Sequence, residues 1–348
     1  MSAGSIRAAR AFVELHLNSK EFSDGLTAAK TSMTSFANTA KSVGANMIGI
    51  GVSMSIPFAL AAKEFATFEQ EMATVGAVTQ ATAVDFETLT EEAKRLGLTT
   101  TFTATEAAEA MTVLGRAGFN TAEIMAAIPH ALSLARATAT DLGESARIAA
   151  AALRVFGLNA SETGRVVDTL TATSINSAQT LEGLGEGLKF VGPFARQAGI
   201  SIEKTSAIMG ILADNGIRGT VAGTGFARVL KNLSQTPKVK LLEELGVDVK
   251  DSIGNFREIE DILGDLNRAT AEMGSVERTG IFEQLFGRGA ASAIVAAEAA
   301  DRIDEATEKI EDMRGVASKT AKIMDNTLAG SFRLATSAAQ GLGIAIGD

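Results

Sequence analysis

A chain of 348 residues in which 46% are hydrophobic can bury a sizeable core and form two domains or one elongated helical assembly. The formal net charge is −9, which argues against gripping a phosphate backbone, because such binding needs clustered Lys and Arg. The absence of cysteine excludes disulfides and thiolate metal sites. We therefore expect no cofactor, no metal site and no specific nucleic-acid binding.

The composition also predicts the secondary structure. Alanine dominates the apolar runs, and four prolines leave long stretches free of helix breakers. We expect a mostly α fold: a degenerate helical-hairpin array or bundle with a short N-terminal strand, a small β-hairpin near 247–257 and a long C-terminal helix. The expected divisions are 1–42 (strand and helix), 43–64 (apolar helix), 65–235 (helical core), 236–290 (hairpin and helices) and 291–348 (long helix or coiled coil).

The first segment alternates in polarity. Val13, Leu15 and Leu17 share one face of residues 11–17, which predicts a short strand. Helical spacing follows from 22 to 41, so a strand leads into a helix.

Residues 43–62 are uncharged, and twenty residues are about enough to span a bilayer as a helix. Glycine, serine and asparagine dilute the hydrophobicity, which favours a buried or oligomer-facing helix over a membrane span. Insertion at one stage of a life cycle is the alternative. The side chains expected to pack or to enter the membrane are Met47, Ile48, Ile50, Val52, Ile56 and Phe58.

A repeated pattern of helix ends and starts occupies residues 65–233. Glycine followed by an apolar residue and then a capping residue occurs at Gly97, Gly118, Gly157 and Gly199. Glycine at such a position closes a helix in the left-handed conformation, and Ser, Thr or Asn caps the next one. Thr103 with Glu106, and Asn120 with Glu123, have the spacing of a reciprocal cap. The spacing predicts helical hairpins with short joints.

Farther along, Gly254 and Asn255 predict the turn of the small hairpin. A heptad pattern then predicts a coiled-coil seam, although one amphipathic helix packed on its own domain would show the same pattern. The seam consists of Ile303, Ala306, Ile310, Met313, Ala317 and Met324.

Residues with catalytic or ligand chemistry are dispersed. The two histidines, His16 and His130, are far apart in sequence, with His130 expected at a helix start after Pro129. The glycine-rich stretch 219–225 lacks the Lys-Ser/Thr of a phosphate loop and follows no apolar strand. We expect no catalytic residues.

Several stretches together resemble the core region of phage tail tape measure proteins, also called minor tail proteins. No single motif is specific, but their order and spacing are. The stretches are 68–75, 78–79, 93–97, 102–111, 117–119, 188–193, 216–219, 222–224, 285–287, 328–332 and 344–348.

The resemblance implies a non-enzymatic structural protein of the virion, present in a few copies in the tail lumen after assembly in the host cytoplasm. Such a protein sets tail length and takes part in genome ejection. The partners it implies are further copies of itself, the tail tube protein, tail tip proteins, assembly chaperones and, transiently, the host membrane. As a single helix, 348 residues would reach only about 520 Å, so we expect either the N-terminal portion of a longer ruler or an unusually short or truncated member of the family.

Three other functions would fit the same sequence. The first is a membrane-active, channel-forming component for DNA translocation, based on residues 43–62. The second is a cell-wall hydrolase, which the dispersed histidines disfavour. The third is a helical scaffold of the host carried on a prophage.

Overall fold

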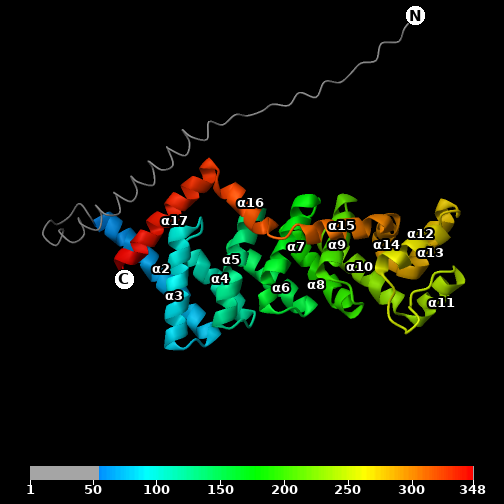
Figure 1. Ribbon diagram of the computed structural model, residues 1–348, viewed down its shortest axis with the longest axis horizontal. Helices are drawn as coiled ribbons and strands as arrows, with labels where there is room; N and C mark the ends of the chain where they lie inside the picture. Colours follow the sequence, from blue (N-terminus) through cyan, green and yellow to red (C-terminus); the bar gives the residue numbers. More distant parts are fainter. Residues whose placement is uncertain (1–54, 348) are drawn as a thin grey trace, which may run out of the picture. The chain divides into compact units, whose positions relative to one another are not determined.

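The computed structural model describes residues 55–347, with side chains from 63 to 345, and the helices from Pro57 onward form one compact unit. This part of the chain is helical, which confirms the mostly α prediction. The first helices are α2 (Ser55–Thr79), α3 (Ala83–Thr99), α4 (Ala104–Arg116), α5 (Thr121–Thr138), α6 (Leu142–Phe156), α7 (Thr163–Asn176), α8 (Leu181–Gln197), α9 (Ile202–Asp214) and α10 (Gly219–Leu233) (Figure 1). They are followed by α11 (Thr236–Glu244), α12 (Ile259–Ala269), α13 (Ser275–Phe286), α14 (Ala290–Glu298), α15 (Ala300–Asp312), α16 (Val316–Asp325) and α17 (Leu328–Gly347).

Helices two apart in the chain pack side by side, which makes two layers. The first layer holds α4, α6, α8 and α10, and the second holds α3, α5, α7 and α9. A Cβ placed on Gly185 of α8 would contact Ile148 of α6, and one on Gly192 would contact Val155. Residue numbers rise in the same direction along α8, from Gly185 to Gly192, and along α6, from Ile148 to Val155, so these two helices of one layer are parallel. Successive helices along the chain run in opposite directions.

Glycines end several of these helices as the sequence predicts. Gly118, Gly157 and Gly199 have φ of +84°, +69° and +77°, values that favour glycine because it has no Cβ. The prediction for Gly97 is wrong, because α3 continues to Thr99. A Cβ at Gly97 would lie 2.6 Å from the backbone nitrogen of Ala104, so this glycine permits close approach of α4.

Reciprocal caps begin two helices as predicted. At the start of α4 the Glu106 carboxylate accepts a hydrogen bond from the Thr103 N–H at 2.7 Å, and the Thr103 hydroxyl accepts one from the Glu106 N–H at 3.1 Å. Asn120 and Glu123 make the same pair of bonds at the start of α5. Each cap satisfies N–H groups that have no partner within the helix.

We expect Thr103→Ala to lower the free energy of unfolding by about 1 kcal/mol, because the N–H of Glu106 loses its acceptor. Urea unfolding followed by circular dichroism would measure the change. Thr103→Ser keeps the hydroxyl and should restore most of the lost stability. Equal losses in the two variants would show that the cap contributes nothing.

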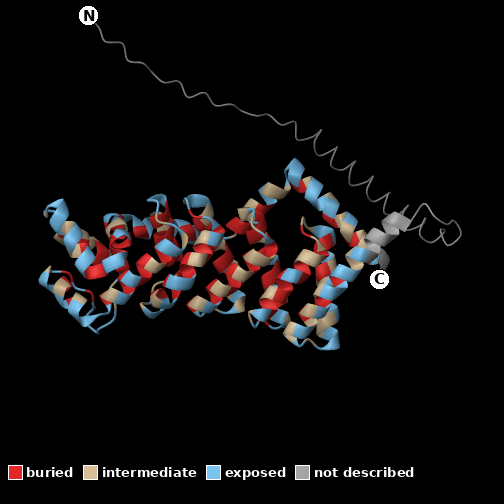
Figure 2. Cartoon of the chain, turned by 180° about the vertical axis from the view of Figure 1, so that it is seen from behind, coloured by how far each residue is buried: buried red, intermediate tan, exposed pale blue. Residues whose placement is uncertain are grey.

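The core lies between the layers and is built mainly from alanine and aliphatic side chains (Figure 2). Phe226, Phe282 and Phe286 are the largest fully buried side chains, and the rings of the last two lie 6.1 Å apart. Small residues at many positions let the helix backbones approach closely, so packing depends on fit more than on large side chains.

Helices α8 and α10 show the closest approach. Gly183 and Gly187 of α8 face Gly219 and Gly223 of α10, and a Cβ on Gly223 would lie 2.6 Å from the Cα of Gly187. The sequence predicts no phosphate-binding role for the glycine-rich stretch 219–225, and in the folded chain its glycines face those of α8.

The segment 247–257 forms a hairpin-shaped turn rather than a hairpin of two strands. Lys250 and Phe256 make an isolated antiparallel bridge, and the structure assigns no strand to the described residues. Gly254 has φ of +92°, and the Asp251 carboxylate accepts bonds from the N–H groups of Ile253 and Asn255 at 3.0 and 2.8 Å. Two backbone hydrogen bonds, from the Asp251 N–H to the Asn255 carbonyl at 2.9 Å and from the Arg257 N–H to the Val249 carbonyl at 3.0 Å, join the two arms of the turn.

The predicted single helix from 291 to 348 is wrong, because four helices, α14 to α17, occupy this region. Gly315 has φ of +74°, which ends the helical path between α15 and α16.

The predicted N-terminal strand and helix, and residues 43–54, lie outside the described residues. The division of the chain at residues 65, 236 and 291 stays a prediction.

Candidate functional site: a C-terminal strap across the second layer

The last three helices return along the array in reverse order. Helix α15 packs on α9, α12 and α7, α16 packs on α5 and α7, and α17 packs on α3 and α4 (Figure 1). We call α15 to α17 the strap. Several polar contacts connect it to the second layer, and four of them are described in turn.

The first contact caps the start of α16. The carboxylate of Asp168, on α7, accepts hydrogen bonds from the N–H groups of Gly315 at 2.6 Å and Ala317 at 3.1 Å. The positive end of the helix dipole favours a negative charge there. Asp168 therefore fixes the place where the strap turns from α15 into α16.

The second contact holds the end of α16. Arg136, on α5, is 6% exposed, and its guanidinium pairs with Asp325 and donates to the carbonyl of Met324 at 2.6 Å. The Thr101 hydroxyl lies 3.3 Å from Asp325 Oδ1. A buried arginine needs such partners, because an unpaired buried charge is costly.

The third contact joins α17 to α3. The Ser337 hydroxyl is buried, 2.7 Å from the carbonyl oxygen of Gly97 and 2.5 Å from that of Phe102, and can donate its proton to either. A Cβ on Gly341 would lie 2.8 Å from Leu98 Cδ2, so small residues bring α17 close to α3.

The fourth contact is a charged cluster around Lys204 of α9. Its ammonium group lies 2.6 Å from Glu260, 2.9 Å from Glu258 and 3.3 Å from Asp304 of the strap. Burial opposes protonation of Lys204, but hydrogen bonds from its ammonium to the two glutamates outweigh it and leave the pKa raised. Burial raises the pKa of Glu260.

A bidentate ion pair beside the strap joins α7 to α9. Arg165 Nε and Nη2 donate to the two carboxylate oxygens of Glu203 at 2.7 and 2.8 Å. The side chain of Glu203 is 4% exposed and that of Arg165 is 47% exposed. Burial opposes ionisation of Glu203, but the Arg165 hydrogen bonds outweigh it and hold the pKa of Glu203 below its usual value.

The predicted seam residues lie on the strap. Ile303 and Ile310 of α15 and Ala317 of α16 are buried, while Ala306 and Met313 pack against a small cluster formed by Ala172, Ala207, Ile310 and Val316. Met324, at the end of α16, is half-buried. Burial within one chain favours the second interpretation of the pattern, amphipathic helices packed on their own domain. A coiled coil between copies stays a prediction.

Of the predicted membrane or packing residues, Met47, Ile48, Ile50 and Val52 lie outside the described residues. Ile56 and Phe58 lie in α2, where the structure describes the backbone alone. Among the described helices, none combines the length and hydropathy needed to cross a bilayer.

The remaining candidate chemistry is sparse in the described part. His130 lies inside α5 rather than at a helix start, because the Asn120–Glu123 cap begins that helix well before Pro129. Residues 55–347 contain no group of three or more histidine, aspartate or glutamate side chains placed to hold a metal ion.

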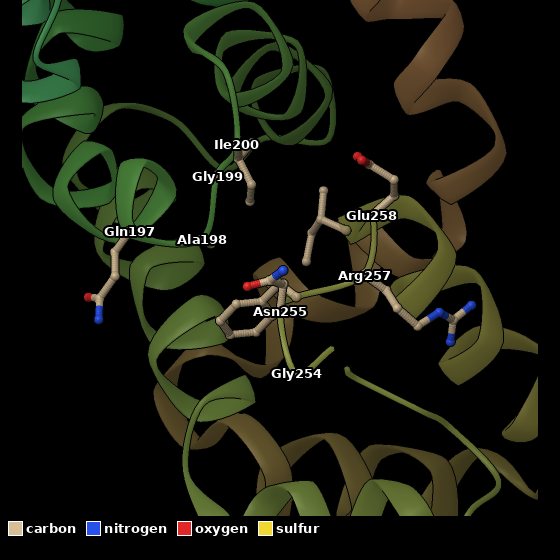
Figure 3. Close-up of a pocket in the computed structure, with 10 residues that line it drawn as sticks. Gln197, Ala198, Gly199, Ile200, Gly254, Asn255, Arg257 and Glu258 are labelled. Carbon is tan, nitrogen blue, oxygen red and sulfur yellow. The ribbon is translucent and has the colours of Figure 1, made fainter. Parts of the chain in front are cut away.

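A cavity of about 470 Å³ separates the end of α8 from the turn before α12 (Figure 3). The Asn255 side chain lies beside it, and that of Arg257 points away. Both charged residues on its wall have partners: Glu258 pairs with Lys204, and Arg257 pairs with Asp265 at 2.8 Å. Its charged groups therefore serve the packing of α9 and α12.

The residues that hold the strap were not predicted from sequence patterns. Arg136 gives one local signal, because it interrupts the small and apolar run of Leu134, Ala135 and Ala137. Asp168, Asp325 and Ser337 have no such signal, since their partners are more than a hundred residues away.

The described unit belongs to the class of two-layered helical arrays, and several of its polar side chains connect one helix to another. Residues 90–287 match the family described as phage-related minor tail protein, and the chain belongs to that family.

Two relatives carry tape measure names. The chain is 31% identical over 299 residues to the tape measure protein of Pneumococcus phage Dp-1, a match that covers 82% of the chain and 26% of the relative. It is 31% identical over 323 residues to the probable tape measure protein of Escherichia phage P2, covering 90% of the chain and 39% of the relative. The chain thus spans well under half of either relative. No solved structure matches.

Proposed function

We propose that this chain acts as a tape measure, or as the part of one, in the assembly of a phage tail. The observation that carries the proposal is the family match over residues 90–287, together with the similarity to tape measure proteins of two phages. The described fold agrees with a structural role, because its buried ionisable groups pair helix with helix.

The proposal includes the location of the protein in the virion and its binding partners. The protein lies in the tail lumen in a few copies, contacts the tail tube protein and tail tip proteins, and depends on assembly chaperones before the tube closes. Genome ejection then releases it from the lumen. Its net charge of −9 suits a channel shared with DNA without tight binding.

Deletion of the gene in a phage that encodes it tests the assembly role. We expect heads without tails in electron micrographs, with normal tails restored by the gene supplied in trans. Tails of normal number and length without the protein would contradict the proposal. Zymograms with the purified chain would reveal any wall hydrolase activity of this part.

Residues 43–62 support a second proposal, a membrane-active role during ejection, because they carry no charge. Liposome flotation of the chain with and without these residues tests it. Equal flotation of the two forms would contradict membrane insertion through this segment.

A further inference from the structure

The described unit is closed in the sense that the chain enters and leaves it at neighbouring helices. The chain enters through α2 and α3, runs along the two layers to α14, and returns along the strap to α17, which packs on α3 and α4. It therefore leaves beside the helices through which it enters. Folded in this way, the unit adds little to the distance between its entry and its exit.

The strap contacts the second layer mainly through small side chains. Its buried residues are Ala300, Ile303, Thr307, Ile310, Val316, Ala317, Ala321, Gly330, Ser337, Gly341 and Ile344. About half of the residues of α8 and of α10 are buried, against about a quarter of those of the strap. Because hydrophobic stabilisation scales with the apolar area buried, the strap is the more weakly held element.

Polar contacts therefore decide whether the strap stays in place. Asp168 caps α16 and Arg136 holds its end, each reaching the strap from a different helix of the second layer. Within the described part, the side-chain hydrogen bonds of both residues go to the strap. Replacing either residue therefore removes no hydrogen bond between two helices of the array.

We infer that the strap opens as a unit while the array from α3 to α10 stays folded. Opening separates α17 from α3, and the released helices would span on the order of 70 Å if they joined into one. This inference rests on the proposed function for its purpose, since a tape measure that stays closed here would gain almost no length from this unit.

Native-state hydrogen exchange on the purified chain tests the opening. We expect the amides of α15 to α17 to exchange through a partial opening with a smaller denaturant dependence than the amides of α4 to α10. Arg136→Ala and Asp168→Ala should each accelerate exchange in the strap by about tenfold and leave α8 and α10 unchanged.

Arg147→Ala is the matched control, because Arg147 pairs with Glu144 within α6, a helix of the first layer. It should leave strap exchange unchanged. The inference fails if strap and array amides share one rate and one denaturant dependence, or if Arg136→Ala accelerates both equally. Exchange is measured without tails, so failure here is separate from failure of the gene deletion test.

Distance measurement gives a second readout, since the absence of cysteine allows labels at two introduced positions. Glu91 of α3 and Ala345 of α17 line one shallow pocket, so Glu91→Cys and Ala345→Cys place two spin labels close together in the closed state. Adding Arg136→Ala should create a population at longer distance. A single short distance in both proteins would overturn the inference.

Discussion

Gly223→Ala should unfold at a markedly lower urea concentration than the parent protein, with a loss of about 3 kcal/mol or more in the free energy of unfolding. The new Cβ would lie 2.6 Å from Cα and 2.7 Å from the carbonyl carbon of Gly187. These are backbone atoms, so no side-chain rotation relieves the clash. Helices α8 and α10 would have to move apart, which disturbs the first layer where its helices approach most closely.

Gly280→Ala is the matched control in the same urea titration. Gly280 lies in α13, is exposed, and has nothing within 4 Å of the position its Cβ would take. Here alanine should stabilise the protein by about 0.5 to 1 kcal/mol, because glycine is the poorer helix former. If both substitutions had the same sign, close approach would not explain Gly223.

The second large effect is expected at the ion pair between α7 and α9. Arg165→Ala should lower the free energy of unfolding at pH 7 by about 2 to 4 kcal/mol, because it leaves the buried Glu203 charge without its bidentate partner. The half-exposed position of Arg165 places the effect below that of a fully buried pair. Thermal or urea unfolding would measure it.

The pH dependence of this loss follows from the lowered pKa of Glu203. A carboxylate with a lowered pKa in the folded state contributes stability above its unfolded pKa, about 4.3, and loses it as the pH falls through the folded value. The difference between parent and Arg165→Ala should therefore be largest near neutral pH and shrink below pH ~4.

Arg165→Ala combined with Glu203→Gln supplies the control, because a neutral amide removes the uncompensated charge. The double variant should be more stable at pH 7 than Arg165→Ala alone and should lose the pH dependence. A difference between parent and single variant that stays constant from pH 7 to pH 3 would show that Arg165 acts through packing instead.

Local features of the sequence predict much of this fold. Thr103 with Glu106 and Asn120 with Glu123 cap helices as expected, and Gly118, Gly157 and Gly199 end them. These interactions lie within a few residues of one another, so a single sequence contains what is needed to predict them. The family resemblance also covers the region that the family match identifies.

Tertiary contacts account for the features that were not predicted. Gly97 has the sequence context of a helix end, but it lies inside α3 because α4 crosses there. The heptad pattern from Ile303 is interrupted at Gly315 in the sequence itself, but the Asp168 cap that starts a new helix there comes from α7. The strap depends on pairs such as Arg136 with Asp325, which only the folded chain brings together.

The alternation of helices between two layers limits how such a protein can change its size. Loss or gain of one helix would transfer every later helix to the opposite side and point its apolar face at solvent. Loss or gain of two successive helices would keep each remaining helix in register with its neighbours. Natural variants of this region should therefore differ in steps of one helix pair, on the order of 40 residues, the usual size of a helical repeat.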